Sequence, residues 1–394
     1  MALLAALAGC QDSIVDLSTV DDEELDDQAA VAPLVSGMAL TLSTAVGFLS
    51  QTGLVAAREM AYGGAGEDLG ATLAQAAGEL TPVDSDRHWN AAHRARWTAE
   101  DGVRRMRAIL GEEDFARSRA AAEALLYVGF TNRLLAENMC QAIIDGGPPE
   151  PRTVHFQRAA DAFTEALAIA ERIGDAALVD AARAGRASAR VGLGDWAGAR
   201  SDAEAVPSGF AFQVRFDGGE DARSNRVAAG STAVQRAHTA WGTFYQTYYE
   251  TTSDPRVPWE TDAANPETRN GLPWLFQAKY DDRETPIDLV TWEEMRLIEA
   301  EAALRNGDVG GAMAEIDALR AAAGVDPWPV DGLESAWTAL KRERGIELWL
   351  EARRLWDLHR WIEEGIPGEA EDMTGRDTCF PIGAIEQGTN PNVP

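Results

Sequence analysis

Basic residues are scarce in this chain of 394 residues, and the first of them is Arg58. Lysine and arginine together number 35 against 64 aspartates and glutamates, which gives a formal net charge of −29 at pH 7. Binding to a nucleic-acid backbone depends on clustered Lys and Arg side chains that displace counterions. A DNA or RNA partner is therefore excluded.

Cysteine is also rare, since the chain contains only Cys10, Cys140 and Cys379. Three cysteines are too few for a disulfide framework. A single bridge between Cys140 and Cys379 is conceivable in an oxidising compartment, but the sequence favours Cys140 as a small, buried apolar residue on a helix. The five histidines form no H-E-x-x-H motif and the cysteines no C-x-x-C motif, so a zinc site has no support.

Nucleotide-binding and calcium-binding loops are missing as well. No segment fits G-x-x-x-x-G-K-[ST], which argues against a phosphotransferase. Acidic residues surround Gly218 and Gly219 at Asp217, Glu220 and Asp221, but their spacing is not that of an EF-hand loop. A solvated acidic turn is the favoured interpretation, and calcium is the alternative. We predict no catalytic residue, no metal site and no cofactor.

Residues 1–27 have the composition of a lipoprotein leader followed by a linker. The first nine residues are apolar, and Leu7-Ala8-Gly9-Cys10 fits the site at which a bacterial signal peptide is cut and the new terminal cysteine is acylated. The acidic residues that follow, with no basic residue among them, predict a solvated tether. We therefore predict a signal remnant and acidic tether at 1–27, with a lipid anchor on Cys10. The alternative is a short disordered terminus with an incidental cysteine.

Residues 28–57 contain no charged side chain, which makes them the candidate for a membrane span. Polar residues and glycines interrupt the segment. Its apolar residues recur at steps of four, four, three and four, at Leu34, Met38, Leu42, Ala45 and Leu49. This spacing is typical of an amphipathic helix packed in a core, so we predict a buried helix rather than a span.

Pairs of helical patterns separated by glycine turns predict a helical repeat fold. Two such patterns lie between residues 100 and 144 and are separated at Gly111. The core of a tetratricopeptide helix is matched by Ala159, Phe163, Ala166 and Leu167. A partner helix is expected at about 176–192, and the same plan returns at 292–305 and 309–321. The predicted fold class is all-α, with degenerate tetratricopeptide-like repeats.

A segment of different composition interrupts these repeats at about residues 210–291. Glycine and proline punctuate it, which predicts loops with short helices or strands. Ten of the chain's 29 aromatic residues (12 Trp, 6 Tyr and 11 Phe) fall within residues 241–292. Long loops carried by a helical scaffold commonly hold a binding surface. We predict one domain over 28–394 with this loop-rich excursion inside it.

The segment from Glu343 to Trp361 predicts a single long helix, because it contains no proline and only one glycine. Charged residues recur along one of its faces at steps of three and four, beside apolar side chains, at Glu343, Glu347, Glu351, Arg354 and Asp357. This pattern predicts a half-buried helix whose charges pair with neighbouring elements. A solvated face with surface ion pairs is the alternative.

The same segment resembles the C-terminal signature helix of the SusD/RagB family of outer-membrane nutrient-binding lipoproteins. Ten of its nineteen positions match the pattern E-R-x-x-E-L-x-x-E-x-x-R-x-x-D-L-x-R-W. The chain also ends as family members commonly do, with Pro381-Ile382, Glu386 and Asn390-Pro391-Asn392. Gly383 replaces the second proline of the family pattern.

This resemblance implies an all-α, tetratricopeptide-like SusD fold and a non-catalytic lipoprotein on the outer membrane, facing outward. Such a protein would capture an oligosaccharide or similar nutrient and deliver it to a SusC-like TonB-dependent transporter. Two alternatives stay open. One is a periplasmic tetratricopeptide-type scaffold that binds proteins, and the other is an α-helical glycoside hydrolase or lyase, since sequence does not reveal how far apart two carboxylates lie.

Sugar binding needs aromatic faces that stack on a pyranose ring, flanked by amides or carboxylates that bind its hydroxyls. Together with the resemblance, this chemistry selects as ligand-binding candidates Trp89, Asn90, Trp259, Trp274 and Tyr280. Trp241, Tyr245 and Tyr248 recur at helical spacing, so the alternative for this stripe is the protein core.

Overall fold

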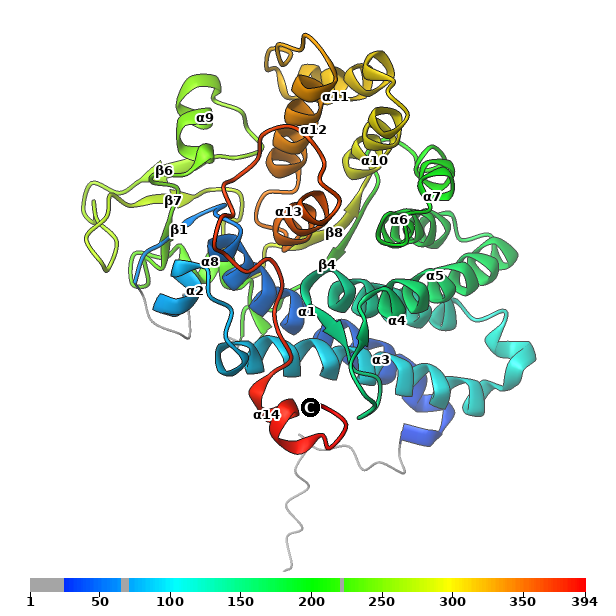
Figure 1. Cartoon of the computed structure of the whole chain (residues 1–394). Helices are drawn as coiled ribbons and strands as arrows, with labels where there is room; N and C mark the ends of the chain where they lie inside the picture. The colour runs from blue at the N-terminus through cyan, green and yellow to red at the C-terminus, as the bar shows by residue number, and fades with distance from the viewer. Residues whose placement is uncertain (1–24, 65–70, 220–222) are drawn as a thin grey trace, which may run out of the picture.

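The computed structural model describes residues 25–64, 71–219 and 223–394 (Figure 1). Its helices are η2 (Gln28–Ala30), α1 (Val31–Ala56), α2 (Leu73–Ala77), α3 (Pro82–Phe115), α4 (Arg119–Asn138), α5 (Thr153–Ile173), α6 (Ala176–Gly192), α7 (Trp196–Ala203), α8 (Arg226–Gly230), α9 (Phe244–Thr252), α10 (Trp292–Arg305), α11 (Val309–Ala323), α12 (Leu333–Glu347), α13 (Arg354–Glu363) and α14 (Ala384–Thr389). Its strands are β1 (Ala61–Tyr62), β2 (Gln141–Ala142), β3 (Glu150–Pro151), β4 (Ala211–Val214), β5 (His238–Thr239), β6 (Trp259–Thr261), β7 (Leu275–Gln277) and β8 (Ile287–Thr291). The predicted all-α, tetratricopeptide-like class is confirmed.

Consecutive helices pack against each other to form the scaffold. The series runs from α3 through α4, α5 and α6 to α7, and α10 then packs on α6 and α7 before α11 and α12 continue it (Figure 1). Three of its turns share one chemistry, in which a glycine in the left-handed conformation ends one helix and an aspartate carboxylate caps the next. These turns are Gly174-Asp175, Gly194-Asp195 and Gly307-Asp308.

Phe163 shows why the repeat motif needs small residues around its aromatic ring. The ring is fully buried between α4 and α6. A Cβ atom built on Gly129 of α4 would lie 2.5 Å from this ring, and one built on Gly185 of α6 would lie 2.4 Å from it. Neither position therefore accepts a larger side chain without displacing Phe163, and the two glycines allow α4, α5 and α6 to approach closely.

Helix α1 lies in the core, as its apolar spacing predicts. It packs on α3 and α4, and Met38, Leu42, Ala45 and Leu49 are completely buried. By length and composition alone, the helical stretch Gln28–Ala56 is also long and apolar enough to cross a membrane. In its most apolar segment of 18 residues, 33% of the residues are buried. Burial is concentrated in the second half, where nearly every residue from Leu42 to Ala56 is covered. The packed-helix interpretation therefore accounts for this segment.

The excursion begins and ends in one antiparallel ladder. Strand β4 pairs with β8, with Ala211 opposite Thr291 and Val214 opposite Ile287. Between them lie the short helices α8 and α9 and the pair β6–β7, while β5 pairs with β1 from the beginning of the chain. The predicted loops with short helices and strands are thus present, and Figure 1 shows them gathered on the side of the molecule opposite α5 and α6.

The predicted single helix over 343–361 is wrong, because the structure breaks it into α12 and α13. Between them Leu350 and Ala352 have positive φ angles of 67° and 60°. Buried partners from distant segments replace the lost helical hydrogen bonds. The Glu59 carboxylate accepts from Leu350 N at 2.8 Å, and the Lys279 ammonium donates to Trp349 O at 2.8 Å. Such contacts stabilise a left-handed turn that local sequence does not favour.

Charges of this segment pair with neighbouring elements, as predicted, and also with one another. Glu343 accepts from Arg320 at 2.9 Å and from Arg256 at 2.7 Å, and Asp357 lies between two arginines of its own segment. Each of these acidic side chains is almost fully buried. These two acidic residues of the signature therefore lie in the interior of the protein.

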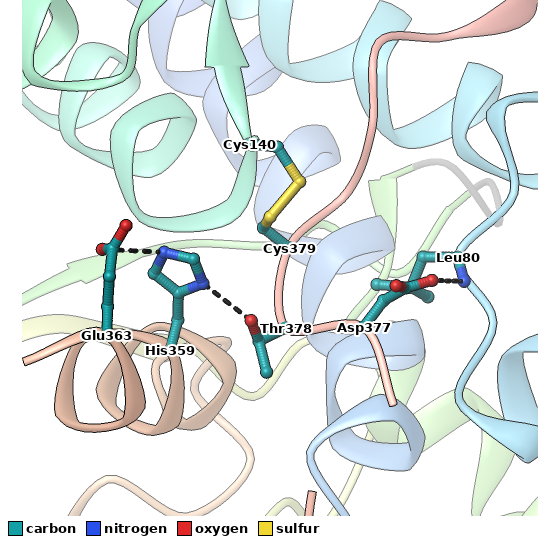
Figure 2. The surroundings of a disulfide bond; sticks show 7 residues. All are labelled: Leu80, Cys140, His359, Glu363, Asp377, Thr378 and Cys379. Carbon is teal, nitrogen blue, oxygen red and sulfur yellow. Dashed lines mark hydrogen bonds and ion pairs between the residues drawn. A yellow bond between two sulfur atoms is a disulfide. The ribbon is translucent and has the colours of Figure 1, made fainter. Parts of the chain in front are cut away.

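Cys140 is bonded to Cys379 across a sequence separation of 239 residues (Figure 2). The favoured sequence interpretation of Cys140 as an unpaired helical residue is therefore wrong, and it lies just beyond the end of α4. The bridge holds the C-terminal segment at this point. Neighbouring hydrogen bonds hold the same segment, from Leu80 N to the Asp377 carboxylate at 2.8 Å and between His359 Nδ1 and Thr378 Oγ1 at 2.7 Å (Figure 2).

Because Glu59 is buried, we expect it to make the stability of the protein depend on pH. Burial raises its pKa from the ordinary 4.5 to about 7, although the hydrogen bond from Leu350 lowers it. Between these two pH values the folded state retains a proton that the unfolded state has lost, so the free energy of unfolding falls as pH rises through this window. The slope from one such group is at most about 1.4 kcal/mol per pH unit.

Glu59→Gln retains an acceptor for Leu350 and removes the titration. Urea unfolding of this variant at pH 5 and pH 7 should therefore show a smaller loss of stability than the wild type shows. Equal losses in the two proteins would mean that Glu59 is ionised in the folded state across this range.

Candidate functional site

Three of the five predicted ligand-binding residues are buried. The exposed fraction is 1% for Trp89, 2% for Trp274 and 5% for Tyr280. Trp89 packs on His93, and Trp274 on Phe276, with ring centroids 4.3 and 4.7 Å apart. These rings present no open face to a sugar, because a chain with 12 tryptophans uses several of them to fill its core. The expectation that they form exposed platforms does not hold for these three residues.

The other two candidates are accessible but lie in different settings. Asn90 is exposed on α3, whereas Trp259 is half-buried with its ring 5.5 Å from that of Tyr249. Ligand binding by either residue stays a prediction.

The sequence stripe of Trp241, Tyr245 and Tyr248 divides into two parts. Tyr245 and Tyr248 are buried on α9, but Trp241 precedes the helix and is 43% exposed. Gly242 has a φ of 75° between them, which turns the chain before α9 begins. The helical spacing in the sequence implied that all three residues share one continuous helix. The turn at Gly242 instead places Trp241 before α9, where its ring is accessible.

A polar cleft of about 440 Å³ is lined in part by Gly242 and Thr243, which follow Trp241 in the chain. Five segments converge on it: the end of α1, strand β1, helix α2, the turn before α9 and the chain after α13. We call it the Arg58 cleft, and its side chains that matter for recognition are Arg58, Tyr62, Thr243, Asp372, Thr374 and Arg376. Trp241 immediately precedes the lining residue Gly242. None of the residues that line this cleft was predicted as a ligand-binding residue, because they come from segments that are far apart in sequence and meet only in the folded protein.

The fold positions each of these side chains by backbone contacts. Tyr62 is held in the β1–β5 ladder, and its carbonyl accepts a hydrogen bond from the Asn270 side chain at 2.9 Å. The Thr243 hydroxyl donates to Ala240 O at 2.7 Å. The Asp372 carboxylate accepts from Thr374 N at 3.0 Å, and hydrogen bonds from Thr374 hold the pKa of this exposed carboxyl below its ordinary value. An ionised acceptor and several donors therefore face one cleft.

Two other clefts have aromatic or charged linings but fewer free groups. In a cleft of about 420 Å³, Phe212 is stacked on Phe130 with ring centroids 5.2 Å apart, and the Tyr127 hydroxyl donates to Glu123. In another of about 430 Å³, the cations Arg256 and Lys279 are both ion-paired with buried glutamates. These charged groups are engaged in ion pairs or hydrogen bonds, whereas Arg58 and Asp372 of the Arg58 cleft make no ion pair among the residues that the structure describes.

Within residues 25–64, 71–219 and 223–394, no group of three or more His, Cys, Asp or Glu side chains is placed to hold a metal ion. At the acidic turn, the Asp217 carboxylate accepts from Gly219 N and pairs with Arg223 at 3.3 Å. Glu220 and Asp221 lie outside the described residues, as does Cys10 with most of the tether.

Comparison with known proteins finds one family model and several solved structures that are similar to this chain. Residues 291–391 match the model of the SusD family, and no curated protein sequence matches the chain. A SusD superfamily protein from Bacteroides fragilis superposes with a TM-score of 0.68 at 12% identity, covering 93% of this chain and 98% of its own.

Two further solved structures have names that state a ligand. The surface glycan-binding protein A from Bacteroides thetaiotaomicron has a TM-score of 0.66 and 12% identity, with 92% of this chain and 97% of its own covered. A SusD-like carbohydrate binding protein from Bacteroides vulgatus has a TM-score of 0.63 and 16% identity, with 88% and 85% covered. At these identities the likeness establishes the shared fold.

Proposed function

We propose that this chain, a SusD/RagB family protein by the sequence of its C-terminal quarter and by its fold, binds a carbohydrate in the Arg58 cleft without transforming it. The observation that carries the proposal is the composition of this cleft. Tyr62 supplies an aromatic face, while Arg58, Asp372 and Thr374 supply donors and an acceptor for sugar hydroxyls. Trp241 does not line the cleft, but it is exposed and immediately precedes the lining residue Gly242. The names of two structural neighbours, as a glycan-binding and a carbohydrate-binding protein, support the same ligand class.

The cellular part of the proposal is an outer-membrane lipoprotein anchored through Cys10 and facing outward. It delivers its ligand to a SusC-like TonB-dependent transporter. The lipobox at Leu7-Ala8-Gly9-Cys10 and the acidic tether support this location. The Cys140–Cys379 disulfide agrees with it, because such bonds persist in oxidising compartments outside the cytoplasm.

The aromatic faces yield a direct test of carbohydrate binding. We expect Trp241→Ala and Tyr62→Ala to weaken the affinity for a glycan identified by array screening, each by roughly 2- to 10-fold, because one aromatic contact contributes about 0.5–1.5 kcal/mol. Isothermal titration calorimetry measures the change. Trp97→Ala is the matched control, since Trp97 is 59% exposed on α3 and, unlike Trp241, is not next to a residue that lines the cleft.

Binding that is unchanged in both cleft variants would move the site elsewhere. Trp259→Ala and Asn90→Ala then test the two accessible residues outside it. Incubation of the wild-type protein with the same glycan, followed by an assay for released products, separates binding from the alternative of a hydrolase or lyase.

A further inference from the structure

Arg58 has a backbone conformation that side chains disfavour. It lies directly beyond α1 with a φ of 62°, donating from its backbone N to Val55 O at 3.2 Å, while Met60 N donates to Leu54 O at 2.9 Å. Glycine is the usual residue at this left-handed position after a helix, because it has no Cβ atom. An arginine at this position is therefore less stable than a glycine would be. Strained backbone conformations of this kind are common at functional positions.

The guanidinium of Arg58 is exposed and has few partners. It donates one hydrogen bond, to the backbone oxygen of Asp372 at 3.0 Å, and it makes no ion pair with any residue that the structure describes. Acids outnumber bases by 64 to 35 in this chain, so most arginines have a carboxylate within reach. Besides the hydrogen bonds from Thr374, the nearby charge of Arg58 lowers the pKa of the Asp372 carboxyl, but this carboxylate makes no ion pair with Arg58, whose remaining N–H donors are free for a ligand.

Arg376 brings a second guanidinium to the same cleft. It donates to the carbonyls of Ala76, Val55 and Ala56, at the C-terminal ends of α2 and α1, where a positive charge is favoured. Burial and then the charge of Arg58 lower its pKa. It too lacks an ion pair among the described residues, and Asp372 is the one carboxylate among those that line the cleft. The lining side chains thus carry two positive charges and one negative charge.

We propose that the Arg58 cleft prefers saccharides that carry an anionic group, a uronate carboxylate or a sulfate ester, with Arg58 as the residue that determines this specificity. The inference rests on the proposed carbohydrate-binding function. A guanidinium presents paired N–H donors in a fixed fork that matches two oxygens of a carboxylate or sulfate. The free donors of Arg58 would take that group, while the Asp372 carboxylate and the oxygen lone pairs of Thr243 and Thr374 remain as acceptors for sugar hydroxyls.

Arg58→Gly separates a binding role from a structural one, because the two effects have opposite signs. Glycine relieves the left-handed strain, so the melting temperature should rise or stay unchanged. Calorimetric titration with oligogalacturonate and with chondroitin sulfate oligosaccharides should show affinity reduced by about 10-fold or more for whichever anionic class binds, as expected for loss of a charge-assisted contact. Arg58→Lys, which retains the charge but not the fork, should lose less.

Neutral malto- and cello-oligosaccharides serve as the comparison, together with the wild-type protein in low and high salt. The expected result is tighter binding of one anionic class than of any neutral oligosaccharide, weakening as salt screens the charge. Equal binding of neutral and anionic saccharides, unaffected by Arg58→Gly, overturns the anionic preference and leaves the proposed function standing. Failure of the wild type to bind any saccharide overturns both.

Discussion

Replacement of Asp357 by alanine is expected to lower the free energy of unfolding by about 3–5 kcal/mol, because it leaves a buried arginine without its partner. Asp357 accepts from Arg344 at 2.9 Å and from Arg360 at 2.8 Å, and all three side chains are at least 97% buried. Arg360 retains Glu301 in the variant, but Asp357 is the one acid with which Arg344 pairs among the described residues.

The pKa of Asp357 reflects the competition between its burial and its ion pairs. Burial by itself raises it, but the guanidiniums of Arg344 and Arg360 outweigh burial and hold the pKa well below its ordinary value. The stabilisation is therefore complete near neutral pH and is lost only in strong acid, as pH falls toward the folded-state pKa.

Glu204→Ala is the control for this prediction, since the Arg200–Glu204 pair is about half exposed on both sides. Exposed pairs of this kind contribute roughly 0–1 kcal/mol. Urea unfolding of both variants compares the two sites. A loss of less than about 1 kcal/mol in Asp357→Ala would show that the interior relaxes around Arg344 or admits water to it.

Removal of the Cys140–Cys379 bond is the second change expected to have a large effect. Its sequence separation of 239 residues closes a long loop, for which the chain-entropy account predicts a stabilisation of about 5.5 kcal/mol through the unfolded state. The double variant Cys140→Ala/Cys379→Ala should therefore unfold at lower denaturant concentration than the oxidised wild type. Engineered bonds often contribute less than this account predicts, so the value is an upper expectation.

Reductant supplies the matched control. Dithiothreitol should lower the stability of the wild type toward that of the double variant and leave the variant unchanged. The hydrogen bonds of Asp377 and Thr378 still hold the C-terminal segment after reduction, so the loss should appear as a shift of the whole unfolding transition. Identical transitions with and without reductant in the wild type would contradict the prediction.

Several features could be predicted from sequence because they depend on local patterns. The helix pairs at 176–192, 292–305 and 309–321 follow from periodicity and from the Gly-Asp turns that end one helix and cap the next. The burial of α1 follows from its apolar spacing, and residues 343–361 resemble the SusD/RagB signature within the part of the chain that the SusD family model matches. Each of these signals lies within about twenty residues of sequence.

The exposure of aromatic rings could not be predicted from sequence, since composition does not distinguish a buried ring from an exposed one. Trp274 and Tyr280 have the same residue types as a sugar platform, yet neighbouring segments cover both. Trp241 was grouped with a buried stripe, and only the turn at Gly242 exposes it.

The sequence by itself determined the helical repeat architecture, the family signature and the absence of nucleotide and zinc motifs, because these depend on residue type and short spacing. Only the tertiary structure decided the break between α12 and α13, the pairing of Cys140 with Cys379 and the assembly of the Arg58 cleft. Each of these joins residues far apart in the chain: Glu59 contacts Leu350, and Arg58 contacts Asp372. Such long-range contacts cannot be recognised from local periodicity. They outweigh the local preference of residues 343–361 for one continuous helix and the preference for glycine at position 58.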